Sequence, residues 1–142
     1  MEIILYYSNF AEITNYVISN NVTGKIINKV NNTESALYYK NGLLHNEDGP
    51  AFESSYGDKY WFKDGLVHRR NGSAIEYNDG SKIWCQNGKY HRIDGPAIEY
   101  YTGAKEWWYR GIDVERKLNI RIKSIEHYKS LIPKLELLLS LE

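Results

Sequence analysis

The sequence predicts a mainly β protein: an elongated antiparallel meander of tandem β-hairpins, with an N-terminal α/β cap and a C-terminal helix. Glycine recurs every 23 residues, at Gly42, Gly65, Gly88 and Gly111, and a fixed period of this size is typical of repeat architectures. Aromatic residues, mainly 13 Tyr and 4 Trp, make up 14% of the chain, and such residues favour strands. Beyond the last of these glycines, apolar residues follow a helical spacing.

Many other positions keep the same interval. The recurring sets are His45, His68 and His91; Gly49, Gly72 and Gly95; Ala51, Ala74 and Ala97; Glu53, Glu76 and Glu99; Gly57, Gly80 and Gly103; Lys59, Lys82 and Lys105; and Trp61, Trp84 and Trp107, with Tyr38 one step earlier. Three full units cover residues 42–110, and partial units flank them on both sides. We therefore expect each unit to be one supersecondary element that packs against its neighbours.

Within one unit, the residue types predict a strand, a longer connection, a second strand and a tight turn. If Asn78-Asp79-Gly80 is a three-residue loop with a left-handed glycine, Glu76 pairs with Lys82. The same register places Ala74 opposite Trp84. The recurring Glu, Lys, Ala and Trp then share one face of the sheet.

The first residues do not follow the repeat. Glu2–Tyr7 and Lys25–Val30 have the composition of strands. Between them, Ser8 or Asn9 is expected to cap a helix over Phe10–Ser19. The chain is therefore divided into an N-terminal capping segment (1–35), the hairpin repeats (36–112) and a C-terminal helical segment (113–142).

From Val114 onward the pattern is helical. Apolar side chains spaced three and four residues apart form one stripe, made of Leu118, Ile122, Ile125, Tyr128, Ile132, Leu135 and Leu139. Pro133 is expected to break or kink this helix just before it. Two interpretations stay open. The helix caps the last hairpin, or it serves self-association through Leu131, Leu135, Leu138 and Leu139.

Residues 88–97 read Gly-Lys-Tyr-His-Arg-Ile-Asp-Gly-Pro-Ala. This segment resembles the His-Arg-x-Asp-Gly-Pro-Ala variant of the MORN repeat (membrane occupation and recognition nexus) that occurs in large DNA viruses and some phages. The resemblance covers about residues 36–112. It departs from the common MORN pattern in the spacing of Gly103 and Trp107 and in a His-to-Gly gap that is one residue longer. The resemblance implies a β-hairpin array and a role in protein interaction, dimerisation or lipid contact, without catalytic residues in the repeat.

The balance of positive and negative charge bears on which kinds of molecule this protein is expected to bind. The 18 Lys and Arg residues equal the 18 Asp and Glu residues, which argues against a nucleic-acid-coating protein and against a membrane role that depends on basic surface. The single cysteine allows no intramolecular disulfide and fits a reducing compartment. Without an apolar run of about 20 residues, no transmembrane segment is expected. We expect a cytoplasmic protein, in the host cytoplasm if the chain is viral.

The recurring histidines are not expected to bind a metal. Equivalent residues of successive hairpins lie roughly 9–10 Å apart, whereas zinc ligands lie about 2 Å from the ion. We expect each ring to bond the backbone of its Gly-x-x-His connection or to stack on its neighbour. Arg69 and Arg92 follow two of them, and Asn46 takes this place in the first unit. The two arginines either contact phosphates or an acidic partner, or form ion pairs within the chain.

Two further side chains are weighed as site residues. Trp108 adjoins Trp107 and must point to the opposite face, which is where a partner surface is expected. Cys85 shares its position in the repeat with Phe62 and Trp108, so we expect a buried thiol rather than a nucleophile.

The sequence therefore favours a non-catalytic module for protein interaction or self-association. It contains no Ser/His/Asp set, no phosphate-binding glycine loop and no zinc-ligand spacing, so neither an enzyme nor a cofactor is expected. The alternative is sequestration of an anionic small ligand, such as a nucleotide, at an oligomer interface. Its binding residues would come from the set His45, His68, His91, Arg69, Arg92 and Trp108.

Overall fold

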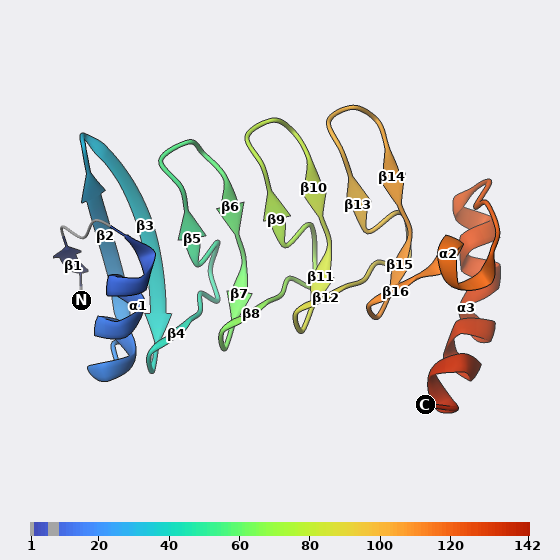
Figure 1. Cartoon of the computed structure of the whole chain (residues 1–142), viewed down its shortest axis with the longest axis horizontal. Coiled ribbons are helices and arrows are strands. Elements are labelled where there is room, and N and C mark those ends of the chain that lie inside the picture. Colours follow the sequence, from blue (N-terminus) through green and yellow to red (C-terminus); the bar gives the residue numbers. More distant parts are fainter. Residues whose placement is uncertain (1, 6–8) are drawn as a thin grey trace.

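The computed structural model describes residues 2–5 and 9–142. The predicted β-hairpin meander is confirmed: the hairpins follow one another along an elongated array with helices at both ends (Figure 1). The main sheet contains β1 (Glu2–Leu5), β2 (Gly24–Val30), β3 (Thr33–Lys40), β4 (Leu43–Leu44), β5 (Phe52–Glu53), β6 (Lys59–Tyr60), β9 (Ile75–Glu76), β10 (Lys82–Ile83), β13 (Ile98–Glu99) and β14 (Lys105–Glu106). Its order is β1-β2-β3-β5-β6-β9-β10-β13-β14, with β4 paired to β3. The pairing of β1 with β2 is parallel, so the sheet is mixed.

Each unit also has a second, smaller hairpin inside the segment that the sequence predicted as a longer connection. These hairpins are β7 (Phe62–Lys63) with β8 (Leu66–Val67), β11 (Cys85–Gln86) with β12 (Lys89–Tyr90), and β15 (Trp108–Tyr109) with β16 (Ile112–Asp113). They lie along the lower edge of the array in Figure 1. In the first of them, Asp64 and Gly65 have φ of 49° and 81°, which is the backbone of the two-residue turns that favour Asp-Gly.

The predicted register of the larger hairpins is confirmed. Glu76 pairs with Lys82, and the equivalent Glu–Lys pairs form in the first and third units. The Ala74–Trp84 part of the prediction is wrong. The Ala74 N–H donates to the Ile83 carbonyl (2.7 Å), and the Trp84 N–H donates to Ala97 of the next unit (2.7 Å). The chain therefore leaves the main sheet at each Trp and enters the smaller hairpin.

The N-terminal segment forms the predicted cap. Asn9 begins α1 (Phe10–Ser19), and its side-chain oxygen accepts from the Glu12 N–H (3.0 Å). The helix lies over one face of β2 and β3 (Figure 1), where Ile13 and Val17 join a buried cluster with strand residues. The last two residues of the predicted first strand and the alternative cap residue, 6–8, lie outside the described residues.

The C-terminal segment differs from the prediction. It forms two helices, α2 (Val114–Leu118) and α3 (Ile125–Ser140), because Asn119 adopts a left-handed conformation (φ 52°) that ends the first. The helix does not break before Pro133, which lies inside α3. An internal proline costs about 3 kcal/mol, and the packing of α3 against the last hairpin offsets this cost. Within the described chain, no helix is both long and apolar enough to cross a bilayer.

Candidate functional site

The recurring histidines join each unit to the next. Their Nδ1 atoms accept hydrogen bonds from the first residue of the following small turn: His45 from Asp64 N (3.0 Å), His68 from Asn87 N (3.0 Å) and His91 from Arg110 N (3.1 Å). These turn residues all have positive φ. Each ring therefore bonds a backbone N–H, but in a turn of the neighbouring unit and not in its own Gly-x-x-His connection as expected.

At the start of the array another side chain takes the place of histidine. In the turn that contains Asn41, the Asn41 N–H donates to the side-chain oxygen of Thr23 (2.9 Å). Val114, one interval after His91, bonds through its N–H to Trp107 (2.9 Å) and begins α2 instead of holding a further turn. The N-terminal cap thus continues the bonding of the repeat through Thr23, and the C-terminal cap ends it with α2.

The two arginines of the repeat are bound within the chain. The Arg69 guanidinium lies 3.9 Å from the centre of the Trp61 ring and contacts Glu76 at 3.1 Å. Arg92 lies 3.8 Å from the Trp84 ring. Cation–π contacts of this kind stabilise a fold by about 0.5–2 kcal/mol. Of the two roles expected for these arginines, the geometry supports the internal ion pair.

After the last arginine of the repeat, Arg92, a residue of the C-terminal helix covers the next Trp ring. The Tyr128 ring packs on Trp107 with ring centres 4.9 Å apart, where an arginine covers the equivalent Trp of the earlier units. Three of the four leucines expected for self-association, Leu131, Leu135 and Leu139, pack in the same cluster, and Leu138 is half-buried. In this structure α3 acts as a cap on the last hairpin.

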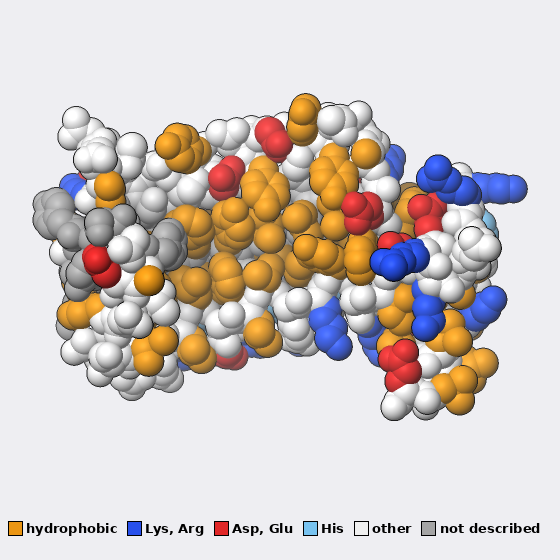
Figure 2. All heavy atoms as spheres, in the orientation of Figure 1, with side chains coloured by type: hydrophobic (Ala, Val, Ile, Leu, Met, Phe, Trp, Pro, Cys, Tyr) orange, Lys and Arg blue, Asp and Glu red, His pale blue; other side chains and the backbone are white. Residues whose placement is uncertain are grey.

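The opposite face of the main sheet carries an unbroken row of apolar side chains, which we call the apolar row. Residues directly opposed in neighbouring strands point to the same face. The row contains Ile26, Leu37, Phe52, Tyr60, Ile75, Ile83 and Ile98. Helix α1 covers its first two members. Figure 2 shows hydrophobic side chains as a band across the array between α1 and the C-terminal helices.

Trp108 lies at the end of this band. Its ring meets Tyr90 edge-on, with centres 5.2 Å apart, and its Nε1–H donates to Glu106 (2.8 Å). Glu106 is the cross-strand neighbour of Ile98. Of the residues predicted as candidates, Trp108 is therefore the one that adjoins the apolar row, and the His and Arg residues are bonded within the repeat. Sequence reasoning missed the row itself, although Ile75, Ile83 and Ile98 were placed in strands.

Other chemistry has little support in this arrangement. Cys85 is buried, which raises the pKa of its thiol to about 11 and keeps the reactive thiolate scarce near neutral pH. Across residues 2–5 and 9–142, no three His, Cys, Asp or Glu side chains are grouped as a metal site.

The histidine bonds predict a pH-dependent stability. Burial, with help from nearby positive groups, lowers the pKa of His68 and of His91. The unfolded histidines, with a pKa of about 6.5, take up protons before the folded ones do. The free energy of unfolding is therefore highest above pH 6.5 and falls as the pH drops through the folded pKa values.

Urea unfolding between about pH 7.5 and 5.5 measures this slope, because the window brackets the histidine pKa and lies above those of most carboxyls. We expect the His68→Asn variant to show a shallower fall than the wild type, since the titrating ring is gone. An unchanged slope would contradict the role given to this ring.

No protein-family model, curated protein or solved structure matches this chain.

Proposed function

We propose that this chain is a non-catalytic binding module that associates with a second copy of itself through the apolar row. The observation that carries the proposal is the part of the row beyond α1, from Tyr60 to Ile98, whose members are half-buried or buried. Figure 2 shows it as a continuous apolar band on this face of the molecule, and a continuous apolar band at a protein surface marks an interaction site.

Three features support a second copy as the occupant. The row repeats along the array, so a copy turned through a two-fold axis presents the same side chains at the same intervals, as an isologous interface requires. The net charge of zero means that two copies do not repel each other. Finally, α1 is about 10 Å thick, and packed sheets lie about 10 Å apart. A second sheet can therefore pack on the apolar row beside α1 without a steric clash.

The resemblance to MORN repeats supports the same class of function, because dimerisation and protein contact are among the roles that it implies. The anionic-ligand alternative receives no such support. Arg69 and Arg92, its main candidate residues, are both held by a ring and a carboxylate of their own chain.

The mass of the protein in solution tests the proposal. Light scattering across a concentration series is expected to give twice the 16.6 kDa of one chain. The Ile83→Asp variant, which places a charge in the row, is expected to stay monomeric. Lys82→Ser is the matched control, since Lys82 is the exposed neighbour on the other face, and it should dimerise like the wild type. A monomeric wild type, or an Ile83→Asp variant that still dimerises, would overturn the proposal.

A further inference from the structure

The third unit shows a complete set of contacts around one guanidinium. Arg92 lies over the Trp84 ring at 3.8 Å. Its Nε donates to Asp94 (2.9 Å), and one terminal nitrogen donates to the Pro96 carbonyl (3.1 Å) and to Glu99 (2.8 Å). One aromatic face, two carboxylates and one carbonyl thus bind this group.

The first unit keeps the residues of this set and lacks the arginine, and here the Asn46 side-chain amide donates to the Pro50 carbonyl (3.0 Å). Asp48, Pro50 and Glu53 stand 46 residues before their counterparts, two full intervals away, and Asn46 replaces the arginine. The backbone position is retained, because the Asn46 N–H donates to Phe62 (3.3 Å) as the Arg92 N–H does to Trp108 (3.4 Å). Among the described residues, neither Asp48 nor Glu53 has an ion-pair partner.

The space for a guanidinium is retained as well. A Cβ added at Gly95 would lie 2.8 Å from the Arg92 guanidinium carbon, so this glycine leaves room for the arginine. At the equivalent Gly49 the nearest atom is Asn46 Nδ2, at 3.7 Å. The short asparagine reaches the Pro50 carbonyl and leaves open the rest of the volume that arginine fills in the other units.

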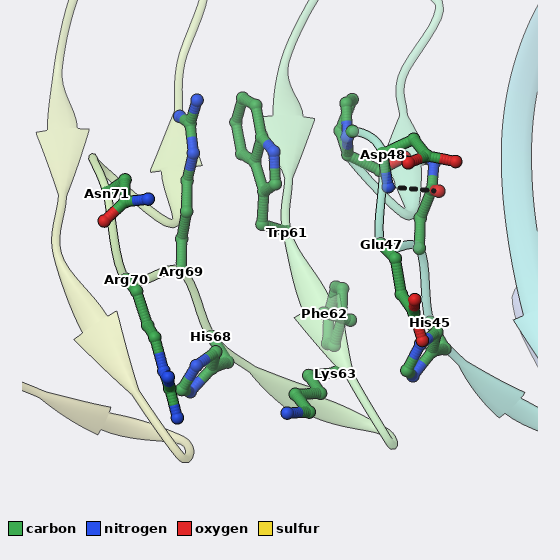
Figure 3. Close-up of a pocket in the computed structure, with 13 residues that line it drawn as sticks. His45, Glu47, Asp48, Trp61, Phe62, Lys63, His68, Arg69, Arg70 and Asn71 are labelled. Carbon is green, nitrogen blue, oxygen red and sulfur yellow. Dashed lines mark hydrogen bonds and ion pairs between the residues drawn. The ribbon is translucent and has the colours of Figure 1, made fainter.

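This volume belongs to a groove of about 720 Å³ between the first two units, which Asp48 and Trp61 help to line. Figure 3 shows the Trp61 indole with Arg69 on one side and the Asp48 loop on the other. Tyr38 holds the Trp position of the first unit. Its own cation contact, Lys25 at 5.8 Å, comes from its partner strand β2, on the side away from Trp61.

The geometry points to a binding site for a guanidinium group in this vacant position, supplied by an arginine side chain of a partner protein. The group would lie between Tyr38 and Trp61, with Asp48 and Glu53 as its anionic partners. Guanidinium is favoured over ammonium because it is planar, stacks on rings and offers forked donors to carboxylates. The site lies on the face of the sheet that carries the recurring Trp residues. The apolar row lies on the opposite face, so the site does not depend on the proposed self-association.

The positive groups of the groove leave this position free. Lys63 and Arg70, together with His68, lie at the opposite end of the groove from the Trp61 indole and the Arg69 guanidinium (Figure 3). Arg69 itself is neutralised by Glu76. The end of the groove near Trp61 therefore presents the Asp48 carboxylate and the indole face turned away from Arg69, as a cation requires.

Titration of the full chain with Nα-acetyl-arginine amide, followed through the indole N–H signals of the four tryptophans by NMR, tests the site. We expect saturable shifts of Trp61 and none of Trp84, with a dissociation constant on the order of millimolar. The lysine analogue should bind about tenfold more weakly, since it loses the stacked, forked contacts. Glu53→Gln should weaken binding as well, and Glu99→Gln should not.

The decisive variant is Asn46→Arg, which fills the position from within the chain. It should abolish the Trp61 shifts and raise the unfolding temperature, whereas Thr102→Arg, which adds the same charge to an exposed loop, should do neither. Equal binding of arginine and lysine analogues, or undiminished binding by Asn46→Arg, overturns the site. Tighter binding of free arginine than of the blocked form overturns a protein side chain as its source.

Discussion

Replacing Tyr128 with alanine is expected to lower the free energy of unfolding by about 3–5 kcal/mol, as for other large buried rings. Tyr128 is 0% exposed and packs on Trp107. Its hydroxyl donates to the carbonyls of Arg92 (2.5 Å) and Trp108 (3.1 Å). The substitution therefore leaves a cavity, an Arg92 carbonyl without its hydroxyl donor and an uncovered indole at the end of the array.

Urea or thermal unfolding measures this loss. Tyr128→Phe keeps the ring and should cost about 1–2 kcal/mol, because only the hydroxyl bonds are lost. Leu137→Ala is the control within the same helix, since Leu137 is 62% exposed, and a surface change of this kind stays within about 0.5 kcal/mol. If Tyr128→Ala and Leu137→Ala behaved alike, α3 would not be docked on the last hairpin.

Replacing Arg92 with alanine is the second large effect that we expect, at about 2–3 kcal/mol. The change uncovers the Trp84 ring and leaves Glu99 without its cation. The estimate stays below that for a fully buried pair, because the Glu99 side chain remains 37% exposed. Denaturant titration measures the loss, and it should appear as a lower midpoint with an unchanged slope.

Two variants sharpen this experiment. Arg92→Lys keeps the charge and loses the planar fork, so it should recover only part of the lost stability. Arg116→Ala is the matched control, because Arg116 is exposed on α2 and should have little effect. A full recovery by lysine would show that charge alone matters and that stacking on Trp84 does not.

The sequence predicted the register because local chemistry determines it. A three-residue loop ending in glycine admits one pairing of Glu76 with Lys82, and that pairing forms. The small hairpins were missed although Asp64-Gly65 is a strong turn signal. Each of their strands is only two residues long. Two residues are too few to show the alternation of apolar and polar side chains that identifies a strand in a sequence. The early end of α2 was missed because Asn119 gives only a weak signal for a left-handed conformation.

In the candidate site, too, some features could be predicted from the sequence and others could not. Strand spacing alone was enough to argue against a metal shared by the histidines. The stacking of Arg69 on Trp61 did not, because residues eight positions apart meet only after the chain has turned through the small hairpin. Asn46 stood out in the sequence as an exception to the arginine position. The significance of this exception depends on Asp48 and Glu53, and only the folded structure shows that they surround the position that the arginine would occupy.

The histidine bond from each unit to the next turn has a consequence for how such a chain changes over generations. Every unit is tied to the next by the same contacts, Thr23 supplies the equivalent contact at the start, and α2 follows the last unit from Val114. An in-frame duplication or loss of one whole interval in the gene would therefore preserve all junctions. A change by one residue more or fewer would misplace every ring beyond it. Lineages carrying this architecture should differ in length by whole intervals.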